Sequence, residues 1–152
     1  MLVTEEWIQP VHAGDAEAFL IGPRGRVKLR TLAHSPVGYA QEAGLLSEED
    51  ALRHPERHVV SNGIGIEGMS IHVGPQLTLA RRDTLLLVSD GVTDNAREAE
   101  IVASIRSGPL RSGVSALVTL CRERMMGVVN GNAGAAAIGK PDDLSVVALR
   151  RK

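Results

Sequence analysis

A short apolar run in this chain stops abruptly at a carboxylate. Residues 84–88 read TLLLV, and SDGVTDN follows directly. A run of this length between polar residues is typical of a strand buried on both faces, although periodicity alone does not exclude a helix. Binding and catalytic groups are common just beyond such a strand, because the strand aims them and the loop exposes them. Asp90 and Asp94 are therefore candidate functional residues.

Size and charge limit the class of protein. The 152 residues, 43% of them hydrophobic, suffice for one domain with a core. A net charge of -1 predicts neither nucleic acid nor an anionic membrane surface as a partner. No stretch approaches the ~20 apolar residues of a membrane span, and the N-terminus lacks a signal-peptide core. The single cysteine, Cys121, falls in an apolar helical pattern, so we expect a buried core residue and not a nucleophile or ligand. One cysteine cannot form an internal disulfide, which indicates a reducing compartment, and we expect a cytoplasmic protein.

The order of predicted elements is mixed α and β. Helix 36–44 is expected to end at Gly44, and helix 47–55 to begin at Ser47, with an acid three residues later. The glycine- and alanine-rich segment 127–141 has no periodicity and is predicted to be a surface loop. Strands are expected within 7–11, 17–21, 26–32, 69–73, 84–88 and 144–150, and further helices within 96–108 and 112–127.

A glycine motif at 63–68, GIGIEG, satisfies the pattern of dinucleotide-binding loops. A phosphate-binding loop of that kind must open a helix, whose N-terminal amides face the pyrophosphate. The residues that follow, MSIHV, alternate like a strand instead. The motif therefore indicates a bend between strands.

Acidic residues occur at the ends of three predicted strands. Asp15 precedes strand 17–21, Asp90 and Asp94 follow strand 84–88, and Asp142 with Asp143 precedes the last strand. Each alone is explained by a turn or a helix N-terminus. Together they converge if the strands lie side by side in one sheet, and clustered carboxylates favour a bound cation.

Oxygen ligands select hard divalent ions such as Mg²⁺ or Mn²⁺. The histidines at 34, 54, 58 and 72 show no ligand spacing along the sequence. They therefore do not contradict a carboxylate site for such an ion.

Several segments, taken together, resemble a known family. Four segments are similar, in order and spacing, to the later motifs of the protein phosphatase 2C-type metal-dependent Ser/Thr phosphatases. In chain order they are HAGDAEAFL, the stretch from HSPVGYAQEAG to HVVSNGIG, DTLLLVSDGVTDN and KPDDLSVVAL. The resemblance extends from about Trp7 to Leu149 and corresponds to the C-terminal part of the family domain.

The resemblance implies a fold and a metal site. The fold would be α+β, the C-terminal portion of a four-layer αββα sandwich with two antiparallel sheets, and residues 36–57 would form the flap beside the active cleft. Asp90 and Asp142 match the aspartates that bind the central metal pair. Asp15, Asp90 and Asp94 match the ligands of an additional, weaker metal. Asp143 stands where the family often has asparagine.

The implied reaction is hydrolysis of phosphoserine or phosphothreonine in a phosphorylated protein, by water activated by two Mg²⁺ or Mn²⁺ ions. The family's DGxGGH-type motif, a further acid and a phosphate-binding arginine lie in early strands, and this chain contains none of them upstream of HAGD. We therefore expect residues 1–152 to be a single, N-terminally truncated phosphatase-like domain with part of the metal site absent.

Other interpretations remain open at this point. A non-catalytic phosphatase-like module could bind a phosphoprotein or a partner subunit, and a second copy of the chain could cover an exposed sheet edge as a homo-oligomer. Asp90 could also be a covalent nucleophile, as in haloacid dehalogenase-like phosphatases. Those enzymes need an acid two residues later, where this chain has Val92, so that interpretation carries little weight.

Overall fold

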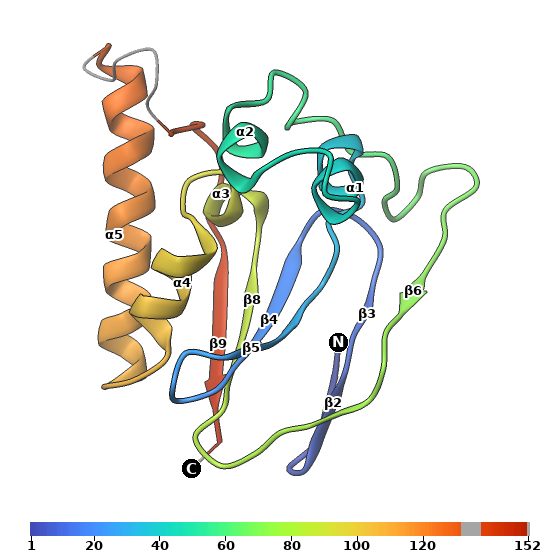
Figure 1. Cartoon of the computed structure of the whole chain (residues 1–152), viewed down its shortest axis with the longest axis vertical. Coiled ribbons are helices and arrows are strands. Elements are labelled where there is room, and N and C mark those ends of the chain that lie inside the picture. The colour runs from blue at the N-terminus through green and yellow to red at the C-terminus, as the bar shows by residue number, and fades with distance from the viewer. Residues whose placement is uncertain (132–137, 152) are drawn as a thin grey trace.

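The computed structural model describes residues 1–131 and 138–151. Groups of strands and groups of helices follow one another along the chain, in the mixed order that the sequence patterns predict (Figure 1). The strands are β1 Leu2–Val3, β2 Trp7–Gln9, β3 Val11–His12, β4 Glu17–Ile21, β5 Val27–Arg30, β6 His72–Val73, β7 Leu77–Thr78, β8 Thr84–Val88 and β9 Val146–Arg150. The helices are α1 Pro36–Glu42, α2 Glu48–Arg53, α3 Asp90–Thr93, α4 Glu98–Ile105 and α5 Leu110–Val129.

A four-stranded antiparallel sheet forms the centre of the molecule, in the order β5-β4-β8-β9. Strand β8 lies between β4 and β9, with Val88 opposite Glu17 on one side and opposite Val146 on the other. The apolar run of the sequence is therefore an internal strand, as predicted. It lies between two neighbours, and four of its five residues are buried.

The two faces of this sheet pack against different layers. Phe19 and Leu86 point to one face and pack against α4 and α5, where Ile101, Leu117 and Cys121 are fully buried. The opposite face packs against β2 and the segment after β7 in a second cluster that contains Ile8, Leu20, Leu79 and Leu85. Alternate residues of β4 and β8 thus fill two cores, which is why these strands have no polar face.

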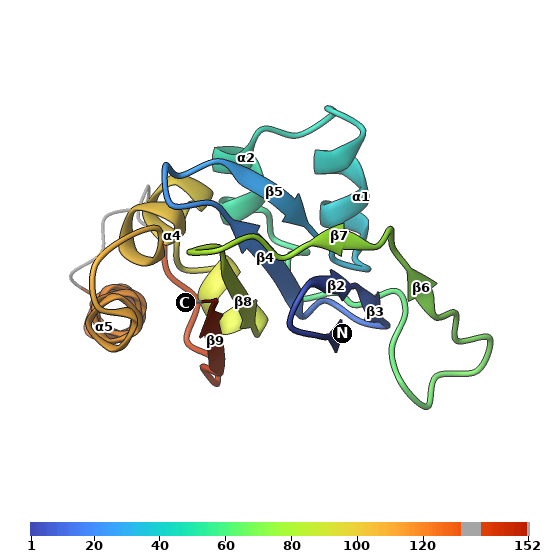
Figure 2. The same cartoon turned by 90° about the horizontal axis from the view of Figure 1, so that it is seen from below.

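A second, smaller sheet, β1-β2-β7, lies on the far side of the central sheet from α4 and α5 (Figure 2). The predicted strand 7–11 is interrupted at Pro10, which has no N–H to donate to a ladder. After Pro10 the chain forms β3, which leaves this sheet and pairs with β6. Predicted strand 69–73 is correspondingly limited to its last two residues.

The predicted surface loop 127–141 needs correction at both ends. Helix α5 continues through Val129, because the glycine at its predicted end is tolerated in the helix interior. Residues 132–137 lie outside the described residues. Ile138 is only 7% exposed, and Lys140 is part of the site described below, so the end of this segment is not surface loop.

Strand β9 is an edge of the central sheet with an uncovered apolar side. Val147 and Leu149 pair with Leu87 and Leu85 and share their face of the sheet. They are nevertheless 63% and 44% exposed. Among the described residues, no helix has the length and apolar character needed to cross a bilayer.

Candidate metal centre

The acid-bearing turns meet at one end of the central sheet. Because Glu17 and Val146 both lie opposite Val88, the residues before β4, after β8 and before β9 share one edge. Asp90 opens α3 directly after β8, and Asp142 lies four residues before β9. The convergence expected from the sequence is therefore present.

A lysine ammonium lies at the centre of three of these acids. Lys140 Nζ is 2.9 Å from Asp90 Oδ2, 2.7 Å from Asp94 Oδ2 and 3.0 Å from Asp142 Oδ2. The lysine side chain is 17% exposed, and those of the three aspartates are 29%, 15% and 33% exposed. One cation therefore bridges three carboxylates in a partly buried position.

A buried asparagine fixes the backbone of this lysine. Asn95 Oδ1 accepts a hydrogen bond from Lys140 N at 2.8 Å, and Asn95 Nδ2 donates to Lys140 O at 2.9 Å. The same amide nitrogen donates to Gly91 O at 3.0 Å, and Asn95 is 0% exposed. Arg57 also donates to Gly139 O at 2.9 Å. Lys140 is thus held at the aspartates by its main chain as well as by its charge.

The pKa values of Asp94 and Asp142 shift in opposite directions beside this cation. Burial raises the pKa of Asp94, and the hydrogen bond from Lys140 opposes that effect. Hydrogen bonding to Lys140 lowers the pKa of Asp142. The pKa of Lys140 is raised, because its contacts with the carboxylates outweigh burial, which is the largest single effect and acts in the opposite direction. The ammonium and its neighbours therefore form a charged cluster.

The turn after β8 leaves no room for a side chain. A Cβ on Gly91 would overlap the carbonyl of Asp143, so the two acidic turns pack backbone against backbone. Ser89 joins them, since its Oγ donates to Asp143 O at 3.2 Å and accepts from Ser145 N at 3.0 Å. The Asp-Gly pair in the sequence is therefore a packing requirement that brings Asp90 close to Asp142.

A cavity of about 410 Å³ opens beside this cluster. Asp15, Asp90 and Asp94 line it together with α1, α2 and the start of α4. No hydrogen bond or ion pair joins Asp15 to Lys140 in the described part of the chain. The structure thus places Asp15 in the wall of the same cavity but outside the cluster of three.

Two features of the structure were not anticipated from the sequence. Lys140 carries no local signal, since it lies in a segment predicted to be loop. Its position two residues before Asp142 was the only available indication. The second is a group of three histidines, His12, His34 and His72, which are distant in sequence and lie close together in space, so sequence spacing gave no sign of it.

Known proteins provide a comparison for this fold and site. No family model matches the chain. A curated relative, the serine/threonine phosphatase Stp of Listeria innocua, is 30% identical over 109 residues, which are 70% of this chain and 42% of the relative. The putative protein phosphatase 2C-type protein of Streptococcus pyogenes is 34% identical over 99 residues, 63% of this chain and 39% of that protein.

Solved structures agree. The serine/threonine phosphatase Stp1 of Staphylococcus aureus superposes with a TM-score of 0.70 at 28% identity, over 80% of this chain and 48% of that one. The serine/threonine phosphatase of S. agalactiae gives a TM-score of 0.71 at 26% identity, over 99% of this chain and 55% of that one. A bacterial serine phosphatase at 24% identity shares the fold with a TM-score of 0.76.

Fold and sequence together therefore define a phosphatase-type α and β domain with antiparallel sheets. The chain belongs to the protein phosphatase 2C-type family of Ser/Thr phosphatases, as the sequence motifs indicate. It spans about two fifths of the length of the curated relatives and about half that of the solved ones.

Proposed function

We propose that this chain is the C-terminal part of a metal-dependent protein phosphatase that hydrolyses phosphoserine and phosphothreonine in proteins. The observation that carries the proposal is the convergence of Asp90, Asp94 and Asp142 on one cation. Carboxylates gathered within reach of a single positive charge also suit a hard divalent ion.

The donor set fits Mg²⁺ or Mn²⁺. Asp90 and Asp142 would hold the ions of the central site, and Asp15, Asp90 and Asp94 would bind a further, weaker one. Both ions prefer oxygen ligands and keep several waters, so a few carboxylates at a cavity are sufficient to bind them. A relative of the same fold, PstP, was solved in complex with two manganese ions, which supports this choice of ion. When bound, such ions supply charge neutralisation and an activated water for phosphoryl transfer.

The chain's own residues would position the substrate. Helices α1 and α2, within the flap-like segment 36–57, line the cavity through Gly38, Glu48 and Leu52 and would control access of a phosphorylated side chain. Lys140, released from the acids, would lie at the rim, where an ammonium can pair with a phosphate oxygen. The complete domain would be the four-layer sandwich, with early strands and helices outside residues 1–152 covering Val147 and Leu149.

The test is hydrolysis of p-nitrophenyl phosphate by the purified chain with and without Mn²⁺, alongside Mn²⁺ binding measured by calorimetry. Asp90→Asn should abolish Mn²⁺-dependent turnover and weaken binding, because one ligand loses its charge. Glu123→Gln, on the exposed side of α5, is the matched control and should behave as the original chain. Binding that is equal in Asp90→Asn and the original chain would contradict the assignment of the ligands.

A second candidate function is a non-catalytic module that binds a phosphoprotein or a partner subunit, a second copy of the chain included. Lys140 favours it, because an internal ammonium satisfies the acids without a divalent ion. Folded chain that shows neither Mn²⁺ binding nor Mn²⁺-dependent turnover would support this alternative, because a phosphatase part with these ligands should still bind Mn²⁺. Mn²⁺-dependent turnover lost in Asp90→Asn would exclude it.

A further inference from the structure

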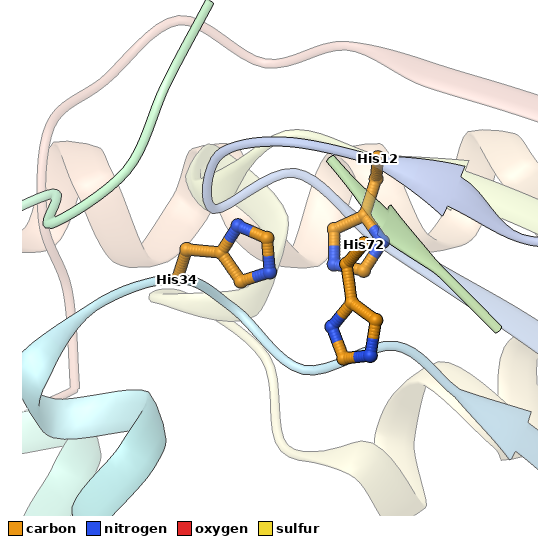
Figure 3. Close-up of side chains that lie close together, drawn as sticks. All are labelled: His12, His34 and His72. Carbon is orange, nitrogen blue, oxygen red and sulfur yellow. The ribbon is translucent and has the colours of Figure 1, made fainter. Parts of the chain in front are cut away.

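Three histidines lie close together and form a second cluster of potential metal ligands (Figure 3). His12 lies on β3, His34 between β5 and α1, and His72 on β6. One ring nitrogen from each lies within 4.8 Å of those of the other two. We propose that this cluster binds one transition-metal ion of the zinc class. The inference does not depend on phosphatase activity.

Strand pairing brings two of the rings together. In the antiparallel β3–β6 pair, His12 lies directly opposite His72. Residues opposite each other project to the same side with Cβ atoms ~4.5–5.5 Å apart, a spacing at which two imidazoles can chelate one ion. The two ring centroids are 5.5 Å apart.

His12 has a lone pair without a partner. Its Nε2 lies 3.0 Å from Leu32 O. A carbonyl oxygen only accepts hydrogen bonds, so Nε2 carries the proton and Nδ1 the lone pair. In the described structure Nδ1 is buried with no hydrogen-bond partner, which is uncommon in folded proteins. A ring N–H on a backbone carbonyl, with the other nitrogen free, is the arrangement that metal-binding histidines use.

His34 supplies the third ring and is 3% exposed. Burial lowers its pKa, and the neighbouring His12 and His72 lower it further, so the imidazole is neutral, the form that binds metals. Its Nδ1 accepts from Gly14 N–H at 3.2 Å and lies 2.7 Å from Asn62 Nδ2, which places the proton on Nε2. Binding through Nε2 shifts this proton to Nδ1, so Gly14 and Asn62 must move away.

The rings must also turn to bind an ion. The three pairs of ring planes are inclined by only 13°, 19° and 25°, whereas a metal lies in the plane of each imidazole that binds it. His72 is exposed, and no hydrogen bond restrains its ring in the described part of the chain, so it is free to rotate. The rings therefore reorient when the ion binds, while the β3–β6 pairing that places His12 opposite His72 is already formed.

The ligands select the ion. Imidazole nitrogens favour Zn²⁺, Co²⁺, Ni²⁺ and Cu²⁺ over Mg²⁺, so this site and the carboxylates would take different metals. Three histidines leave a fourth tetrahedral position to water. A bound ion would link the two-residue strands β3 and β6 to the segment that leads into α1.

The experiment is titration of the full chain with Co²⁺, followed by displacement with Zn²⁺. Tetrahedral nitrogen coordination gives Co²⁺ strong visible absorption, which octahedral oxygen coordination does not. The expected result is one equivalent of tetrahedral Co²⁺, displaced by Zn²⁺. His72→Ala, at an exposed position, should weaken Zn²⁺ binding at least about tenfold, and His12→Ala should do the same. His58→Ala, also exposed, is the matched control and should bind as the original chain.

The variant Asp90→Asn distinguishes metal binding by the histidines from metal binding by the carboxylates. It should leave the Co²⁺ absorption unchanged if the ion is bound by histidines. Equal binding by His72→Ala and the original chain would overturn the proposal, and so would loss of tetrahedral Co²⁺ in Asp90→Asn. Thermal unfolding without metal verifies that each variant is folded, and a folded His72→Ala suffices for the decision if His12→Ala does not fold.

Discussion

The ammonium group of Lys140 lies 2.7 Å from the carboxylate of Asp94, at the point where three acid-bearing turns meet. Of the three aspartates that Lys140 contacts, Asp94 is the least exposed, at 15% of its side chain. The lysine therefore neutralises the carboxylate that is hardest to leave charged and unpaired. In the proposed metal site, this ammonium would compete with a divalent ion for the same carboxylate oxygens.

Replacement of Lys140 should have opposite effects on stability and metal binding. In Lys140→Met the acids lose their cation, so the metal-free chain should lose about 1–2 kcal/mol of unfolding free energy. Mn²⁺ should bind more tightly than in the original chain, because it no longer displaces an ammonium. Urea unfolding without metal and calorimetric titration with Mn²⁺ measure the two effects.

The control for this variant is Arg122→Met, which removes an exposed positive charge from α5. Neither quantity should change in it. Weaker Mn²⁺ binding in Lys140→Met would mean that the lysine supports the metal site and does not compete for it.

Gly91 should be irreplaceable at the turn after β8. An added methyl group would overlap the carbonyl of Asp143, so Gly91→Ala must push the two acidic turns apart. We expect a loss of about 2–4 kcal/mol of unfolding free energy and weaker Mn²⁺ binding, measured by urea unfolding and calorimetry.

Gly127 provides the matched comparison in the same chain. It lies inside α5, and a Cβ there would meet nothing within 4 Å. Gly127→Ala should therefore stabilise the protein by about 0.5–1 kcal/mol, since alanine favours helix. Similar losses in both variants would contradict the packing argument.

Removal of the Asn95 amide should disturb the site through the backbone of Lys140. Asn95→Ala leaves the buried backbone groups of Lys140 and the carbonyl of Gly91 without their partner. The cost should be at least about 1–3 kcal/mol in chemical unfolding. Mn²⁺ binding should change as well, since Lys140 is no longer held. Asn130→Ala, at the exposed C-terminal end of α5, should alter neither property.

Glu100 should make stability depend on acid pH. Arg124 hydrogen-bonds both carboxylate oxygens, at 2.6 and 2.8 Å, and this is the main reason that the pKa of Glu100 falls from 4.5 to about 2. A lowered pKa stabilises the folded state above pH 4.5, and this contribution is lost as pH falls from 4.5 towards 2.

Glu100→Gln should therefore cost about 1–2 kcal/mol at pH 7, after allowance for solvent screening. The difference from the original chain should shrink as pH is lowered through that range. Urea unfolding at a series of pH values checks this. A constant difference at every pH would show that the carboxylate charge is not the cause.

Local patterns in the sequence predicted most of the elements. The apolar run at β8, the N-cap at Ser47 and the apolar stripe of α5 with Cys121 all appear where expected. Such features depend on neighbours a few residues away, which is why periodicity and capping reveal them. The interruption of the predicted strand at Pro10 was not anticipated. Pro10 lacks a backbone N–H, and the residues after it pair with β6 instead of continuing in the sheet of β2.

The positions of acids at the ends of three strands, and their match to the later motifs of a phosphatase family, can be read from the amino-acid sequence. Which of these acids meet depends on how the strands pair and pack. The register of β4, β8 and β9 brings Asp90 and Asp142 to one edge. A contact between segments 50 residues apart places Lys140 next to Asp90. The β3–β6 pair brings together His12 and His72, which show no metal-ligand spacing in the sequence. Sequence patterns report nearest neighbours, whereas a site is made by strand pairing and packing between distant segments.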